Sequence, residues 1–224
     1  MTHALLGRKI SMTQLFAEDG RMIPVTVIQV GPCPVVQVRT KEKDGYVAIQ
    51  IGYDELKKNV TKPMKGHFRK AKVPPQRHLR EIRLNGKDAA PVEVGTELTA
   101  KIFQIGDIVD VIGTTKGKGF QGTVKRHHFS RGAESHGSMN VRQPGSIGQS
   151  SDPSRVFKGM RMGGHMGASQ ATVKNVEVVR IDTEANVIFV KGSIPGPNGG
   201  VVLVRDARTG STKEQRERPL VPAE

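Results

Sequence analysis

The sequence predicts a mainly β protein, an antiparallel barrel or sandwich, from which two basic segments depart. Three observations support this prediction. Short apolar runs, several of them alternating with polar residues, recur between turn residues along much of the chain. No long amphipathic helices separate these runs, as a doubly wound α/β fold would require. The 224 residues, 36% of them hydrophobic, are enough for one large domain or for one domain with a sizeable insertion.

The expected strands begin with Ile23–Val30, in which Ile23, Val25 and Val27 lie on one face. The further expected strands are residues 35–39, 46–51, 98–104, 107–112, 173–181, 187–190 and 201–204, separated by turn sequences rich in Gly, Pro, Asp and Asn. Helix is expected only as short pieces at 54–59 and 121–128, because Pro63 and the Pro74-Pro75 pair interrupt the segment that follows the first of them. The segment 207–224 is polar, and we expect it to be loose.

Positive charge is concentrated in two segments. The chain has 35 Lys and Arg against 21 Asp and Glu, a net charge of +14, and a pI of about 10.2. Between Lys57 and Arg83 ten basic residues face one acid, and between Lys116 and Met166 nine face two. The remaining residues are nearly neutral. Since such segments repel themselves unless an anion neutralises them, a polyanionic partner is the simplest explanation.

Residues 113–167 form the most unusual stretch. Twelve of these 55 positions are Gly, and the apolar side chains follow no period. A stretch of this kind cannot bury enough apolar surface to offset its own ordering entropy. Its glycines allow close backbone approach, and its spaced Arg and Lys suit phosphates. We therefore expect an arm that folds on RNA.

Composition also limits the class and location of the protein. No stretch approaches the roughly 20 apolar residues of a membrane span, so we expect no membrane association. Arg8 and Lys9 interrupt the first apolar residues, so we expect no export signal. The single Cys33 excludes an internal disulfide. A cytoplasmic location is the expectation.

Catalytic and metal motifs are weak. Gly117-Lys-Gly119-Phe-Gln-Gly122 matches a nucleotide-binding glycine loop, but the partner tripeptides of kinases, a Walker Ser or Thr and a βαβ context are missing from the sequence. His127, His128, His136 and His165 lack the tight paired spacing of zinc ligands, and RNA contact suits them better. No nucleophile elbow or acid–base couple is present. We expect no enzyme activity, no cofactor and no metal.

Several ordered motifs carry a family resemblance. They include Gly7–Gln14 with Phe16–Gly20, and Gly113–Arg126, the most specific of them. They continue with Pro144-Gly-Ser-Ile-Gly-Gln149 and Lys158-Gly-Met-Arg-Met-Gly-Gly164. With these motifs the chain resembles, over nearly its whole length, the bacterial form of the universal large-subunit ribosomal protein L3 family.

The resemblance implies a translation-protein-type β-barrel with an α/β insertion and a long, irregular Gly/Arg/Lys-rich arm. It implies a structural constituent of the large ribosomal subunit that binds rRNA near its 3′ end, contacts neighbouring ribosomal proteins and nucleates early assembly. The arm would reach toward the peptidyl transferase centre. In some bacteria the last residue of the Gly-Ser-Ile-Gly-Gln motif is N5-methylglutamine, so Gln149 is a candidate modification site for a glutamine methyltransferase.

On this basis residues 1–53, 95–112 and 168–206 are assigned to the barrel core, 54–94 to a basic inserted subdomain, 113–167 to the arm and 207–224 to the tail. The residues expected to bind rRNA are Lys57, Lys58, Lys62, Lys65, Arg69, Lys70, Lys116, Lys118, Lys125, Arg126, His127, His128, Arg131, Arg142, Arg155, Lys158 and Arg161. The glycines expected to allow backbone approach are Gly117, Gly119, Gly122, Gly145, Gly148, Gly159, Gly163 and Gly164.

Two other functions stay open at this point. A free RNA chaperone or translation factor would use the same charge with weaker, reversible binding. A nucleotide-dependent enzyme built on Gly117–Gly122 would bind ATP as the isolated protein. The sequence leaves undetermined which rRNA nucleotides and neighbouring proteins are contacted, whether Gln149 is methylated, whether the arm is ordered off the ribosome and what the tail does.

Overall fold

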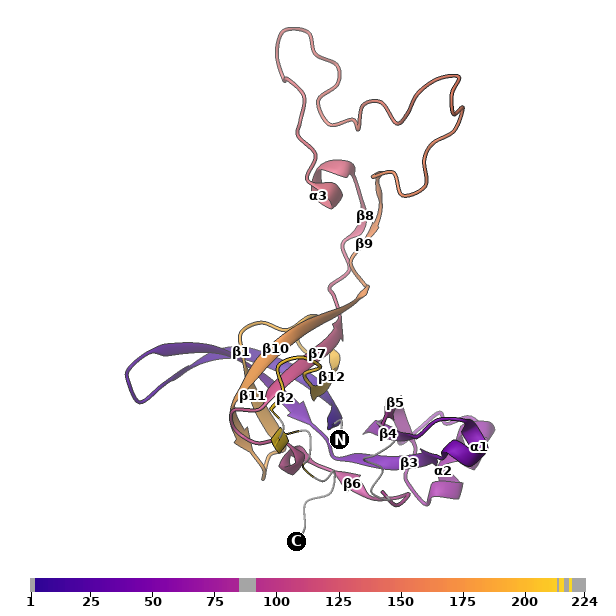
Figure 1. Cartoon of the computed structure of the whole chain (residues 1–224), viewed down its shortest axis with the longest axis vertical. Coiled ribbons are helices and arrows are strands. Elements are labelled where there is room, and N and C mark those ends of the chain that lie inside the picture. The colour runs from indigo at the N-terminus through magenta and orange to yellow at the C-terminus, as the bar shows by residue number, and fades with distance from the viewer. Residues whose placement is uncertain (1–2, 85–91, 213, 216–217, 219–224) are drawn as a thin grey trace. The chain divides into compact units, whose positions relative to one another are not determined.

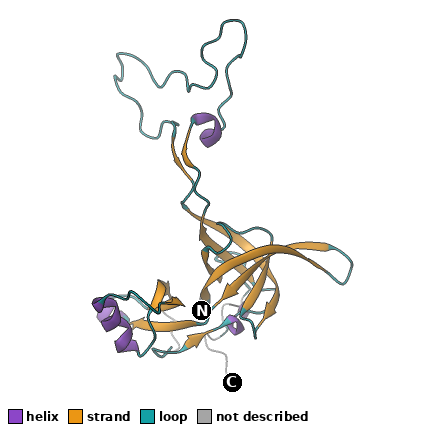
Figure 2. Ribbon diagram, turned by 180° about the vertical axis from the view of Figure 1, so that it is seen from behind, coloured by secondary structure: helices purple, strands orange, loops and turns teal. Residues whose placement is uncertain are grey.

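A computed structural model describes residues 3–84, 92–212, 214–215 and 218 of the chain. The chain divides into two compact units, Met1–Thr114 with Gln170–Glu224 (unit 1) and Thr115–Ser169 (unit 2). Strands predominate among the described elements (Figures 1 and 2), so the predicted mainly β class is confirmed. No helix among the described residues is long and apolar enough to cross a membrane.

Six antiparallel strands of unit 1 close a barrel in the order β1-β12-β7-β10-β11-β2. These strands are β1 (Ala4–Phe16), β2 (Met22–Val30), β7 (Ile108–Thr114), β10 (Gln170–Asp182), β11 (Val187–Lys191) and β12 (Val201–Asp206). Alternate side chains fill the interior, because successive residues of a strand point to opposite faces. On β12, for example, Val202 and Val204 are at most 2% exposed, whereas Val201 and Leu203 are half-buried.

A second sheet of four strands has the order β5-β4-β3-β6. Its strands are β3 (Cys33–Arg39), β4 (Ala48–Glu55), β5 (Gln76–Arg83) and β6 (Glu97–Leu98), accompanied by helices α1 (Lys41–Asp44) and α2 (Lys62–Ala71) and the 3-10 helix η1 (Ala100–Ile102). Ile49, Ile51 and Ile82 of this sheet belong to the same hydrophobic core as the barrel residues. Phe68 and Ala71 of α2 pack with Val36 and Val73 in a smaller cluster.

The second sheet corrects the predicted division of unit 1. Strands β3, β4 and β6 were assigned to the barrel core through residues 1–53 and 95–112, but among the described strands they pair only with one another and with β5. Apolar alternation identifies a strand and its buried face, but it does not say to which sheet the strand belongs. Strand β5 itself was not expected, because its basic sequence Gln76–Arg83 lacks a clear alternation.

Three local predictions in unit 1 are wrong. Residues 54–59, expected as a helix, contain the end of β4 and a loop. Residues 98–104, expected as one strand, contain the end of β6 and then η1. Pro63 does not interrupt a helix but lies in the first turn of α2, where a missing backbone N–H costs no hydrogen bond.

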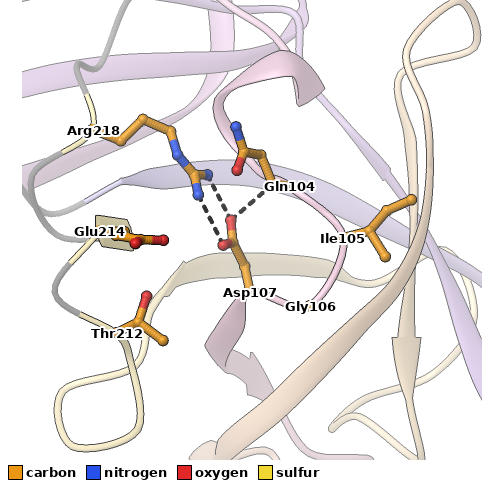
Figure 3. Close-up of a pocket in the computed structure, with 7 residues that line it drawn as sticks. All are labelled: Gln104, Ile105, Gly106, Asp107, Thr212, Glu214 and Arg218. Carbon is orange, nitrogen blue, oxygen red and sulfur yellow. Dashed lines mark hydrogen bonds and ion pairs between the residues drawn. The ribbon is translucent and has the colours of Figure 1, made fainter.

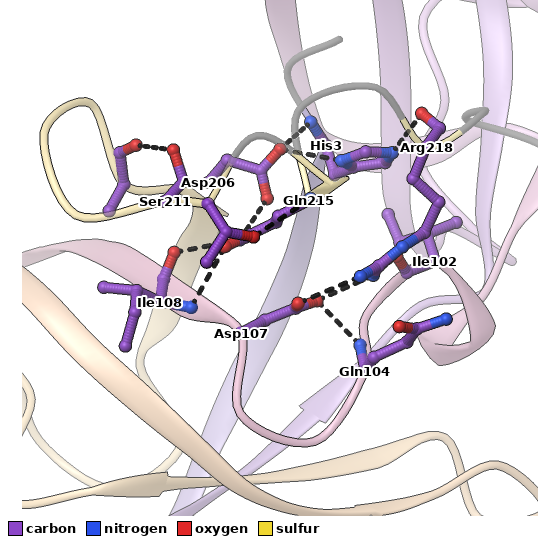
Figure 4. A network of polar contacts seen from close by, with 11 residues as sticks. His3, Ile102, Gln104, Asp107, Ile108, Asp206, Ser211, Gln215 and Arg218 are labelled. Carbon is purple, nitrogen blue, oxygen red and sulfur yellow. Dashed lines mark hydrogen bonds and ion pairs between the residues drawn. The ribbon is translucent and has the colours of Figure 1, made fainter.

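The described part of the tail is packed rather than loose, which corrects the expectation for 207–224. Ser211 and Gln215 are 8% and 1% exposed. Gln215 joins the backbone of Ile108 to Asp206, and Arg218 forms a bidentate ion pair with Asp107 at 2.8 and 3.0 Å (Figure 4). Ile108 and Asp107 lie more than 100 residues away in sequence, so the polar composition of the tail did not reveal these contacts. The rest of the tail lies outside the described residues.

Candidate nucleic-acid interface

Unit 2 begins and ends on a two-stranded stem. The amide of Thr115 donates to the carbonyl of Ser169 at 2.9 Å, and the amide of Lys118 donates to the carbonyl of Met166 at 2.9 Å. Strands β8 (Gly119–Gln121) and β9 (Gly164–Met166) then pair antiparallel. Because Thr114 and Gln170 are register partners in the barrel, the chain leaves and re-enters unit 1 at neighbouring positions.

The short helix α3 (Thr123–His127) follows β8 and is hydrogen-bonded to Met162, just before β9. Both Nη1 of Arg126 and Nε2 of His127 donate to the carbonyl oxygen of Met162, at 2.8 and 3.0 Å. A Cβ on Gly164 would lie 2.5 Å from Nη1 of Arg126, so the absence of a side chain there makes room for the guanidinium. Arg126 and His127, both expected to bind RNA, therefore also hold the arm together.

Unit 2 has no hydrophobic core. All 55 of its residues are described, and Thr123 is its single buried residue. No helix or strand occurs between α3 and β9 (Figure 2). The exposed fraction is 80% for Phe120, 92% for Met139 and 48% for Phe157. Apolar burial within the unit therefore contributes little to its stability, and these side chains are free to contact a partner.

The cations of unit 2 are mostly unneutralised. Eight of its nine Lys and Arg side chains are exposed, and Arg126 is half-buried. Across residues 115–169, all of which are described, Arg131 is the one cation with a carboxylate partner, Glu134. The guanidinium of Arg155 lies 5.1 Å from the centre of the Phe157 ring. The cations without a carboxylate or ring partner are Lys116, Lys118, Lys125, Arg126, Arg142, Lys158 and Arg161.

The eight glycines expected to allow backbone approach fall into three groups. Gly119, Gly145 and Gly159 have φ of 68°, 78° and 82°, values that favour glycine. Gly163 and Gly164 lie tightly against neighbouring atoms of unit 2 itself. At Gly117, Gly122 and Gly148 a Cβ would meet nothing nearer than 3.7 Å. For five of the eight, the fold of unit 2 therefore already gives a reason for glycine, and backbone approach to RNA stays a prediction.

Gln149 lies in the irregular part of unit 2 and is exposed. It lines an open hollow of about 310 Å³ together with neighbours from residues 147–156. Ser154, one of these neighbours, donates from its hydroxyl to the carbonyl of Ser151 at 2.6 Å, which closes a turn beside the hollow. The amide of Gln149 is thus accessible to an enzyme or to RNA. Among the histidines of unit 2, His128 is the C-cap of α3 with φ of 60°, and His136 lies in a turn with φ of 55°.

Unit 1 carries a second basic surface on α2. Phe68 and Ala71 face inward, and the outer face holds the four exposed cations Lys62, Lys65, Arg69 and Lys70. No acid lies in the first turn, where the helix dipole favours negative charge and disfavours lysine. Lys57 and Lys58 are exposed in the preceding loop. Among the described residues, none of these six side chains pairs with a carboxylate.

The nearby strand β5 adds to this positive potential, because its arginines belong to the basic segment Lys57–Arg83 identified in the sequence. Burial lowers the pKa of His78, the Asp54 carboxylate opposes this shift, and Arg77 and Arg80 lower the pKa further. Arg83 stacks over the ring of Tyr46 at 5.1 Å. Basic residues therefore continue from α2 along β5.

The alternative sites carry no catalytic arrangement in the described residues. The glycine loop Gly117–Gly122 leads into a helix of five residues, not into a βαβ unit. The described part of the chain contains no group of three His, Cys, Asp or Glu side chains that could hold a metal. A hollow of about 500 Å³ in unit 1 lies beside Asp107 (Figure 3). Both oxygens of this carboxylate bind Arg218, and one also accepts from the backbone amide of Gln104 at 2.7 Å. The carboxylate of Asp107 is therefore engaged in structural hydrogen bonds.

Sequence reasoning missed the groups that anchor the arm. The carbonyl oxygen of Met162 accepts hydrogen bonds from two side chains, and the guanidinium of Arg155 lies over the ring of Phe157. A backbone acceptor has no side-chain signature, so no motif could have identified it.

One comparison with known proteins bears on this surface. The family model described as ribosomal protein L3 matches residues 76–186. The matched range contains all of unit 2 and the strands β5, β7 and β10.

Proposed function

Because the chain belongs to the ribosomal protein L3 family, we propose that unit 2 is an arm that enters large-subunit rRNA and that its free cations neutralise phosphates there. Membership makes the protein a structural constituent of the large ribosomal subunit, located in the ribosome, that binds rRNA and ribosomal proteins. It is not an enzyme.

The observation that carries the proposal is a unit of 55 residues with one buried residue and seven cations that have no carboxylate or ring partner. Such a segment gains little from burial and suffers self-repulsion, so its order is favoured by a polyanion that threads around it. Neutralising phosphates releases condensed counterions, and this release favours binding. Packed RNA helices would both surround the arm and supply the phosphates that neutralise its cations.

The surface of α2 is proposed as a second RNA face. Its four outward cations lie along one helix of 10 residues, and the lysines of its first turn oppose the helix dipole. A phosphate backbone near Lys62 and Lys65 would reverse this unfavourable interaction.

Several finer proposals rest on the resemblance of the motifs. The barrel would be of the translation-protein type, the arm would extend toward the peptidyl transferase centre, and binding near the 3′ end of the rRNA would nucleate early assembly in the cytoplasm. Gln149, in the exposed motif Gly145–Gln149, would be the N5-methylglutamine made by a methyltransferase. Mass spectrometry of the peptide that contains Gln149 tests this point, and a peptide without the added mass of one methyl group would contradict it.

The main proposal is tested by charge reversal in the arm. The variant Lys125→Glu/Lys158→Glu spares Arg126, which holds the arm together, and changes two exposed side chains without partners. We expect its incorporation into large subunits, in competition with the unchanged chain, to fall about tenfold or more, since each reversal replaces an attraction to phosphate by a repulsion.

The matched control is Lys41→Glu/Lys43→Glu, an equal charge change on two exposed lysines of α1, outside both basic segments. Incorporation is measured in the subunit peak of a sucrose gradient at about half-molar salt, where surface contacts alone weaken strongly. Equal incorporation of the two variants would refute the arm as the principal RNA-binding element.

A further inference from the structure

The hairpin of β1 and β2 extends beyond the wall of the barrel (Figures 1 and 2). β12 pairs with β1 only from Ala4 to Arg8, and the backbone of Lys9 bonds to residues 199–200. On the other side, β11 pairs with β2 only from Val25 to Gln29. In the described part of the chain, residues 11–16 therefore pair only with residues 22–27 of β2, and their other edge has no neighbouring strand; we call residues 10–24 the hairpin tip.

The hairpin tip exposes large apolar side chains on one face. Phe16 and Met22 are register partners and so share a face, and they are 70% and 57% exposed. Met12, four residues before Phe16, lies on this face as well and is 49% exposed. Apolar side chains clustered on a projecting ribbon indicate a binding surface.

The outer edge of β1 is unprotected along the tip. Residues 10–16, Ile-Ser-Met-Thr-Gln-Leu-Phe, include no charged residue and no proline. Natural proteins usually protect a free edge with Lys, other charges or Pro, because its open N–H and C=O groups pair readily with another chain. The opposite strand of the tip does carry Pro24. In a chain with 35 basic residues, an edge without a lysine favours pairing.

The charge of the tip disfavours RNA. Its turn contains Glu18 and Asp19, and its single cation, Arg21, pairs with Asp19 at 2.5 Å. Glu18 is exposed and has no cationic partner among the described residues. A phosphate backbone would be repelled here, and it has no ladder of amides and carbonyls to match the edge of a strand.

We infer that the outer edge of β1 at residues 10–16 accepts an extended segment of another protein, rich in Lys or Arg, which adds to the hairpin as a further strand. Main-chain hydrogen bonds would supply affinity, as in other cases of strand addition. Met12 and Phe16 would contact alternate side chains of the segment, and Glu18 would attract its basic residues. The inference rests on the proposed function in one respect, the location of the chain in the large subunit. It does not depend on how unit 2 contacts rRNA.

Site-directed cross-linking tests the inference on assembled subunits. Gln14 lies between Met12 and Phe16 and is exposed, so the variant Gln14→Cys places a thiol on the surface without removing an apolar contact. The native thiol does not interfere: Cys33 is 0% exposed, and burial raises its pKa to about 12. The thiol is labelled with a maleimide–benzophenone reagent in purified large subunits, and the photoproducts are sequenced by mass spectrometry.

The expected product resists nuclease and joins Cys at position 14 to a Lys- or Arg-rich peptide of a different protein. Adding Met12→Lys/Phe16→Lys should lower its yield about tenfold or more. Adding Val94→Lys, which replaces a 47% exposed apolar side chain elsewhere in unit 1, should leave the yield unchanged.

Cross-links to rRNA, to a second copy of this chain or to nothing would overturn the inference if the chain is present in the subunits. Absence of the unmodified chain from the subunits would overturn the proposed function, and the inference with it. If Gln14→Cys alone is excluded from subunits, Met22→Cys on the same face serves as the reporter, and the same outcomes decide.

Discussion

We expect the side chain of Gln215 to contribute strongly to the stability of unit 1, because it is buried and hydrogen-bonded. Its side chain is 1% exposed and makes three hydrogen bonds (Figure 4). Nε2 donates to the Ile108 carbonyl at 3.0 Å and to Oδ1 of Asp206 at 2.9 Å, while Oε1 accepts from the Ile108 amide at 3.2 Å. The substitution Gln215→Ala removes all three hydrogen bonds and leaves the Ile108 amide, the Ile108 carbonyl and the Asp206 carboxylate without this partner.

The expected cost follows from these contacts. A neutral hydrogen bond contributes about 1 kcal/mol, and one to a charged group about 1.5–3 kcal/mol. The variant should therefore lose about 3.5–5 kcal/mol of unfolding free energy, a large part of the roughly 5–15 kcal/mol that is typical of a whole protein. For a chain of this size the melting temperature should fall by roughly 7–20 °C.

Thermal unfolding followed by circular dichroism in the β region measures the effect. Gln215→Leu keeps most of the volume but none of the hydrogen bonds, so it should cost about as much as Gln215→Ala. The control is Glu214→Ala at the neighbouring exposed position, for which a change within about 0.5 kcal/mol is expected. Equal melting temperatures for Gln215→Ala and Glu214→Ala would show that the tail does not pack as described.

Three further predictions concern the arm and the core. Gly164→Ala should displace the Arg126 guanidinium and speed hydrogen exchange in α3, whereas Gly148→Ala, where a Cβ would meet nothing nearer than 3.8 Å, should not; equal exchange would contradict the close contact. Lys118→Ala should make the log–log salt slope of RNA binding less steep by about 0.7–0.9, the contribution of one phosphate, as measured by filter binding, and an unchanged slope would remove this lysine from the interface. Because burial raises the pKa of Cys33 from 9.0 to about 12, the folded state favours the protonated thiol. Its contribution to stability should therefore be complete below pH 9 and be lost as the pH rises toward 12; rapid reaction with a thiol reagent at pH 8 without denaturant would contradict this burial.

The sequence was sufficient for the features that depend on local pattern. The alternation in Ile23–Val30 identified β2 within one residue, and the runs near 187 and 201 identified β11 and β12. The many glycines and aperiodic apolar residues of 113–167 predicted a segment that buries little of itself, as seen in unit 2. These inferences succeed because strand alternation and apolar content are properties of neighbouring residues.

The tertiary structure decided everything that depends on partners far away in sequence. It placed β3, β4 and β6 in a second sheet, because sheet membership follows from pairing and not from the pattern within a strand. It placed Gln215 against Ile108, 107 positions away, where a polar side chain is buried because its hydrogen bonds are satisfied. It directed Arg126 and His127 to a backbone carbonyl as well as toward solvent. It also left the edge of β1 open at residues 10–16, since only the lengths of the neighbouring strands determine where pairing stops.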